Sequence, residues 1–131
     1  LREIIIQNAS PGKAAALAQL KYLESLRFKD CAIGESDFLV LAKLPRLKEL
    51  FFQACTVDGA FVDGLKKLNI KRLVLNRMKI SESQIKQLAL LKGLSTLELR
   101  GLDVSEKLIR YLNNSLPKTS VQAVPGGDNT W

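Results

Sequence analysis

One spacing pattern of apolar residues recurs five times along the chain. Its most complete copy places Leu47, Leu50, Phe52, Cys55 and Val57 in the pattern L-x-x-L-x-L-x-x-C-x-V. Copies begin near residues 1, 23, 47, 70 and 94, so successive starts lie 22, 24, 23 and 24 residues apart. A nearly constant period of this length indicates units of supersecondary structure that stack on one another.

Within each unit the spacing of the apolar residues changes. Alternate apolar residues such as Leu50 and Phe52 fit a strand with one buried face. Helical spacing follows, as in the group Phe61, Leu65 and Leu68. Each unit is therefore predicted to be a short strand, a turn and a helix of two to three turns.

Turn and cap residues separate the predicted strands from the predicted helices. Ser81 with Gln84 fits a capping box, while Asp58 and Ser105 fit single N-caps. In the first unit the turn Ala9-Ser10-Pro11-Gly12 precedes an alanine-rich helix. Pro11 suits the first turn of that helix, because its missing N–H has no partner there in any case.

The predicted fold is an α/β solenoid with short parallel strands on its concave face and helices on its convex face. Five units occupy residues 1–118, and residues 119–131 form a partial terminal strand and a loop tail. Val121 falls in the register of Leu97, and Pro125-Gly126-Gly127-Asp128 is a turn or loop signal. No polar cap precedes Leu1. We therefore expect the chain to be part of a longer protein, or another element to cover that end.

The segments LKELFFQACTV and LESLRFKDCAI resemble leucine-rich repeats. Cys31 and Cys55 at the turn position resemble those of the cysteine-containing subclass and its bacterial relatives. The resemblance spans about residues 1–118 and implies a binding scaffold. Elsewhere the turn position holds Ala9, Met78 and Leu102, whose side chains cannot donate a hydrogen bond. We expect packing and backbone hydrogen bonds to hold these turns.

Composition argues against several classes of function. The chain has no histidine, the commonest general base and metal ligand. Cys31 and Cys55 have no second cysteine pair nearby, and we expect two buried thiols rather than a disulfide or a zinc site. The segment Ser10-Pro11-Gly12-Lys13 lacks the spacing of a phosphate-binding loop. We predict no enzymatic activity, no cofactor and no metal.

Two further properties concern location. The chain has no uninterrupted apolar run near the roughly 20 residues that a membrane span needs. It starts at Leu1 without a methionine, which indicates a processed or trimmed start. The sequence does not predict a compartment.

The candidate site lies on the strand residues that point away from the core. In register, the central column reads Ile5, Arg27, Phe51, Val74 and Glu98. We expect Phe51 to be exposed there, and an exposed aromatic flanked by arginines is typical of interface hot spots. An ordinary exposed aromatic, or a Phe covered by a neighbouring element, is the alternative. The predicted partner-binding residues are Phe51, Val74, Arg27, Lys29, Gln53, Arg72, Arg77 and Arg100.

The charge of the chain is spread over its surface. The net charge is +7, but the outward strand positions hold eight basic and five acidic residues, a balance of +3. One local cluster stands out in the fourth unit, where no acidic residue occurs before Glu82; its members are Lys71, Arg72, Arg77 and Lys79. Together with Arg100 and Lys29, this cluster is a candidate site for an acidic segment or a phosphate. The alternative is a solvated surface cluster without function.

Three hypotheses about function follow. The first is a protein-interaction module that presents its concave sheet, around Phe51, to a partner. The second is a binder of polyanions, either nucleic acid or acidic lipid, with steep salt dependence. The third is a structural spacer that associates end to end with neighbouring domains or copies.

Overall fold

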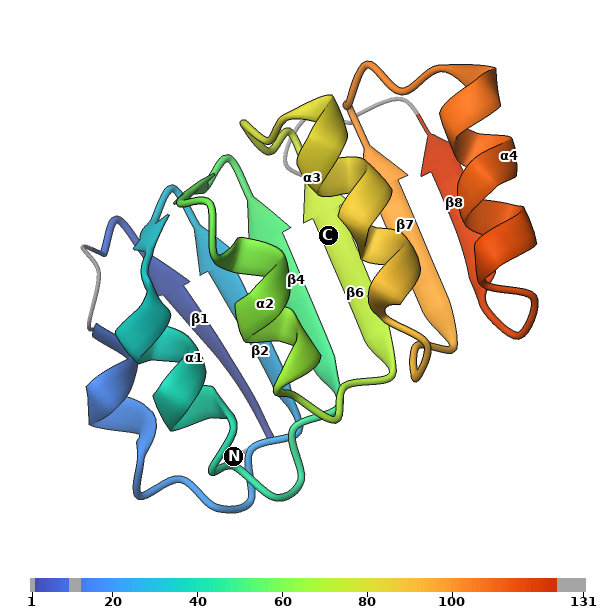
Figure 1. The fold of residues 1–131 in the computed structure, drawn as a ribbon. Coiled ribbons are helices and arrows are strands. Elements are labelled where there is room, and N and C mark those ends of the chain that lie inside the picture. The colour runs from blue at the N-terminus through green and yellow to red at the C-terminus, as the bar shows by residue number, and fades with distance from the viewer. Residues whose placement is uncertain (1, 10–12, 125–131) are drawn as a thin grey trace.

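Residues 2–9 and 13–124 of the 131-residue chain are described by the computed structural model. They form an α/β structure with a parallel six-stranded sheet whose strand order, β1-β2-β4-β6-β7-β8, follows the chain. Figure 1 shows the helices side by side in front of this sheet. Leu1, the Ser10-Pro11-Gly12 turn, the Pro125-Gly126-Gly127-Asp128 loop signal and Trp131 lie outside the described residues.

The elements alternate along the chain as the repeat predicts. The strands of the large sheet are β1 Glu3–Gln7, β2 Ser25–Lys29, β4 Glu49–Gln53, β6 Arg72–Asn76, β7 Thr96–Arg100 and β8 Ser120–Val124. Two short strands, β3 Ala32–Ile33 and β5 Thr56–Val57, form a second parallel sheet. The helices are α1 Glu35–Leu41, α2 Phe61–Lys66, α3 Glu82–Gln87 and α4 Glu106–Ser115, with 3-10 turns η1 Lys13–Leu17 and η2 Leu88–Leu90.

The core lies between the sheet and the helices. Equivalent residues of neighbouring strands stack in it, so that Leu26 pairs with Leu50 and Phe28 with Phe52. The rings of Phe28 and Phe52 are parallel, with centroids 5.3 Å apart, and Phe61 of α2 meets Phe52 edge-on at 5.4 Å. Val121 of β8 lies opposite Leu97, in the register that the sequence predicts.

The chain turns in the same way after five of the strands. The residue that follows each strand has a positive φ between 53° and 62°: Asn8, Asp30, Ala54, Arg77 and Gly101. The N–H of each residue donates to the carbonyl of the last residue of the next strand, as Ala54 does to Asn76 at 2.9 Å. These backbone bonds hold successive turns together.

The buried cysteine thiols add side-chain hydrogen bonds to two of these turns. Cys31 donates to the carbonyls of Ile6 and Lys29, and Cys55 to those of Phe28 and Gln53, all at 3.3–3.4 Å. Both thiols are free, and burial raises the pKa of the Cys55 thiol to about 11. They therefore act here as weak donors inside the structure.

Two of the three predicted N-caps are confirmed. The Ser81 hydroxyl accepts from the N–H of Gln84, whose side chain accepts from the Ser81 N–H, and Ser105 accepts from the N–H of Leu108. Asp58 is not the cap of α2, which begins two residues later than the sequence indicates. Its carboxylate accepts from the N–H of Ala60 instead. The alanine-rich segment near the start of the chain is a 3-10 turn.

Candidate functional site

The second face of the large sheet, which we call the open face, differs from the face that packs on the helices. In Figure 1 the four α-helices lie on one side, and none of those described lies behind the sheet. Strand residues with side chains on the open face form the column Ile5, Arg27, Phe51, Val74 and Glu98, by pairing of β1, β2, β4, β6 and β7. This is the column that the sequence predicts.

The expected exposure of Phe51 is wrong. Phe51 is 5% exposed, although none of the described helices lies on its side of the sheet. The guanidinium of Arg27, its neighbour in the register, lies over the ring at 4.2 Å from the centroid, and that of Arg72 at 5.2 Å. Arginine stacks well on aromatic faces because its planar cation is attracted by the ring quadrupole. Phe51 therefore lies beneath the surface of the open face, and the guanidinium groups of Arg27 and Arg72 lie above its ring.

Val74, a predicted partner-binding residue of the same column, is also buried, at 2% exposure. Ile5 is the exposed apolar residue of the column, at 61%. It belongs to the edge strand β1, which has a neighbouring strand, β2, on one side only. Long side chains of the neighbouring strands can therefore cover Phe51 and Val74 from two sides, whereas they can cover Ile5 from one side only.

Glu98 links two of the arginines. Its carboxylate accepts from Nη2 of Arg72 at 2.9 Å and from Nη2 and Nε of Arg100 at 2.8 Å and 3.1 Å. Burial works to raise the pKa of this carboxyl, but the hydrogen bonds and charges of Arg72 and Arg100 outweigh it, and the pKa is lowered from its ordinary value of 4.5. Glu98 is thus a charged, buried carboxylate that orders two guanidinium groups.

The other arginine contacts are more exposed. Nε of Arg27 lies 3.2 Å from Glu3, which also accepts from the hydroxyl of Ser25 at 3.1 Å. Arg72 additionally lies 3.8 Å from Glu49. The ion pairs thus form two groups, one of Arg27 and Glu3 and one of Arg72, Arg100, Glu49 and Glu98. Together they hold three positive and three negative charges, so ion pairs order the open face without a net charge.

Two recesses mark this face. The first, which we call the central recess, has a volume of about 120 Å³ and is lined by Arg27, Phe51, Arg72, Val74, Asn76, Glu98 and Arg100. The second, the β1–β2 recess, has a volume of about 360 Å³ and is lined by Glu3, Ile5, Gln7, Arg27 and Lys29. Arg27 lines both, so the two recesses are neighbours on one surface.

Asn76 is the residue that sequence reasoning missed. It is 2% exposed and lines the central recess, and its Oδ1 is buried without a hydrogen-bond partner among the described residues. A buried polar atom without a partner costs about 1–3 kcal/mol. The available signal was the register, which places Asn76 between Gln53 and Arg100.

The remaining predicted residues are dispersed. Lys29 lies in the β1–β2 recess, Gln53 is buried beside Asn76, and Arg77 is exposed at the positive-φ turn after β6. The basic cluster of the fourth unit is divided, because Lys71 donates to the carbonyl of Gly93 at the opposite end of the strand. Of that cluster, Arg72 alone lines the central recess.

The described residues contain no group of three or more side chains suited to hold a metal ion. The helices of the described segments are all too short or too polar to cross a bilayer.

Comparison with protein-family models, with curated proteins and with solved structures found no match to this chain. The resemblance to leucine-rich repeats therefore stays a prediction from the sequence.

Proposed function

We propose that this chain is a protein-interaction module that receives its partner on the open face of the sheet. The observation that carries this proposal is the arginine network over Phe51. Arg27, Arg72 and Arg100 are fixed by ion pairs on a face that no described helix covers. Ordered arginines above an aromatic ring lose little conformational entropy when a partner docks, which favours affinity.

The architecture that we propose is a leucine-rich-repeat solenoid with this face as its concave side. It is supported by the equivalent pairing of Leu26, Leu50, Leu73 and Leu97 across neighbouring strands. It is also supported by the repeated positive-φ turn after each of five strands. Such repeats expose a continuous sheet surface along the stack, which suits an extended partner.

Binding of a polyanion is the second candidate, and the net charge of +7 favours it. The ion pairs of Arg27 with Glu3 and of Arg72 with Glu49 and Glu98 argue against it on the open face. Nucleic-acid binding driven by counterion release needs several uncompensated cations. We therefore place the protein-interaction function first.

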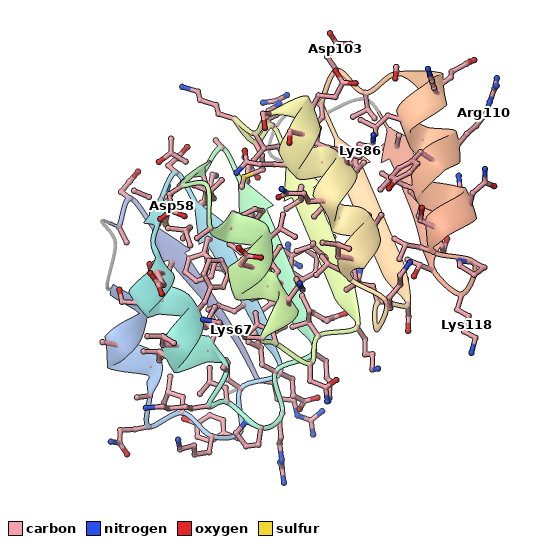
Figure 2. All side chains as sticks on the ribbon, viewed as in Figure 1. Asp58, Lys67, Lys86, Asp103, Arg110 and Lys118 are labelled. Carbon is pink, nitrogen blue, oxygen red and sulfur yellow. The ribbon has the colours of Figure 1, made fainter. Side chains whose placement is uncertain are left out.

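A capture experiment with charge-matched variants tests the proposal. Lys29→Glu changes the open face, whereas Arg110→Glu makes the same charge change on α4, where Arg110 points away from the sheet (Figure 2). Proteins captured from a lysate by the immobilised chain are quantified, and lysine cross-links locate the contact. We expect Lys29→Glu to lose partners that Arg110→Glu retains, with cross-links at Lys29.

Equal loss in the two variants would contradict the proposal, as would cross-links confined to lysines of the helices such as Lys66 and Lys86. Capture that is abolished by nuclease treatment or by moderate salt would favour the polyanion alternative instead. Circular dichroism confirms beforehand that both variants are folded.

A further inference from the structure

The central recess presents more hydrogen-bond donors than its own carboxylate uses. Arg100 donates through Nε and Nη2 to one oxygen of Glu98, and its Nη1 has no acceptor among the described residues. A guanidinium carries five N–H donors in a planar fork that matches carboxylate geometry. The side chains of Arg72 and Arg100 are 38% and 31% exposed, so both are partly accessible from solvent.

Asn76 provides a second and independent observation. Asn76 lines the recess, and its Oδ1 is buried without a hydrogen-bond partner among the described residues. An amide oxygen accepts a hydrogen bond, so a ligand that satisfies it must bring a donor, such as a peptide N–H. A group with a carboxylate and a neighbouring N–H complements both Arg100 and Asn76, and an acidic residue of a peptide has both.

The charge balance favours a carboxylate over a phosphate. The lining of the central recess holds three arginines and Glu98, while Glu3 and Glu49 pair with the outer sides of Arg27 and Arg72. A singly charged carboxylate adds to this network without a large excess of negative charge. A phosphate, at about −1.5 to −2, would meet repulsion from these glutamates.

Building on the proposed function, we propose that the partner contributes an acidic segment whose Glu or Asp side chain enters the central recess. Arg72 and Arg100 bind its carboxylate, and Asn76 accepts a hydrogen bond from its backbone. The same segment continues across the strands and places an apolar side chain on Ile5 in the β1–β2 recess.

The strand spacing sets the length of this segment. Ile5 and Val74 lie in one register column and are three strands apart. At about 4.8 Å between strands the separation is about 14 Å, which an extended chain at about 3.3 Å per residue covers in about four residues. The expected motif is therefore an apolar residue and an acidic residue about four positions apart.

Fluorescein-labelled Gly/Ser peptides test this inference by fluorescence polarisation on the whole chain. The first peptide carries Leu and Glu four positions apart; the second has Gln in place of Glu; the third has phosphoserine there. We expect saturable binding of the first peptide, at least tenfold weaker binding of the second, and weaker binding of the third. A dissociation constant for the first peptide above about 1 mM would overturn the proposal, and so would preference for phosphoserine.

A matched pair of variants assigns the contact to the recess. Hydrogen bonds to charged groups contribute about 1.5–3 kcal/mol, so Arg100→Gln is expected to weaken binding at least tenfold. Arg110→Gln removes the same charge from an exposed pair with Glu106 and is expected to change binding less than twofold. Equal effects would show non-specific charge attraction and would overturn the site.

Nuclear magnetic resonance of the unmodified protein gives a readout that does not depend on a variant folding. Titration with N-acetylglutamate N-methylamide, which carries one carboxylate beside peptide N–H groups, should shift the Nε–Hε signals of Arg72 and Arg100 in a saturable way and leave that of Arg110 in place. Uniform shifts would refute the assignment. If the lysate partners bind through Lys29 but these signals do not respond, the carboxylate inference fails and the proposed function stands.

Discussion

Phe51 and Phe52 are neighbours in one strand and are both buried, but by different means. Phe52, with no exposed surface, packs among the rings of Phe28 and Phe61. Phe51, 5% exposed, lies beneath the guanidinium groups of Arg27 and Arg72. The first environment is hydrocarbon that cannot rearrange cheaply, whereas the second is a layer of long charged side chains that ion pairs hold at the surface. The face that packs on the helices, which we call the covered face, thus supplies stability. The open face supplies a surface whose charged side chains are in contact with solvent.

The largest expected effect separates these two phenylalanines. Phe52→Ala should lower the free energy of unfolding by about 3–5 kcal/mol, because a cavity remains among rigid neighbours. Phe51→Ala should cost about 1.5–3 kcal/mol, because Arg27 and Arg72 can settle onto the vacated space and regain water. Urea unfolding followed by circular dichroism measures both. A larger loss for Phe51→Ala would break the distinction between the faces.

Tight packing of the covered face predicts the next effect. A Cβ added at Gly64 of α2 would lie 2.4 Å from the ring of Phe38, in a buried part of the helix layer. Gly64→Ala should therefore destabilise the protein by about 1–3 kcal/mol through overpacking.

Gly93→Ala is the matched control, because no described atom lies within 4 Å of the added Cβ. Thermal unfolding of both variants measures the difference. If Gly64→Ala were as stable as Gly93→Ala, the covered face would be as adaptable as the open one.

The smallest expected effect concerns the pH dependence of stability. Because Arg72 and Arg100 lower the pKa of Glu98 below 4.5 in the folded protein, the stabilisation is fully present above the unfolded value and is lost as pH falls below it. Glu98→Gln removes this group, so its stability should fall less steeply between about pH 5 and 3.

Unfolding midpoints of wild type and Glu98→Gln across this pH range check the expectation. The exposed pair of Glu106 and Arg110 supplies the control, since Glu106→Gln should leave the slope nearly unchanged. Parallel pH profiles for wild type and Glu98→Gln would contradict the expectation, because they would show that the ion pairs of Glu98 contribute little to the stability of the folded protein.

Periodicity was sufficient to predict the strands of the large sheet, their parallel order and the stacked core, but not the short strands β3 and β5. Leu50 and Phe52 face the core because their spacing alternates, and the register of Val121 with Leu97 followed from the same pattern. The ion pairs of Glu98 lay beyond this reasoning. They depend on the rotamers of Arg72 and Arg100, which spacing along the chain does not determine.

The burial of Phe51 was within reach of the sequence, because the register places Arg27 beside it. Exposure was predicted because Phe51 points away from the core, and long side chains of the neighbouring strands cover it instead. Asn76 could be placed on the open face by register, but its lack of a described partner emerges only from the three-dimensional arrangement.

We propose that the open face serves to bind rather than to stabilise, and a change of Asn76 distinguishes the two roles. Asn76→Leu replaces a buried amide, whose Oδ1 has no described partner, by an apolar side chain of similar size. The measurement is its free energy of unfolding in urea. We expect the free energy of unfolding to rise by about 1 kcal/mol, because an unsatisfied buried acceptor is removed. A loss of similar size or more would show that Asn76 supports the fold, and would contradict the claim.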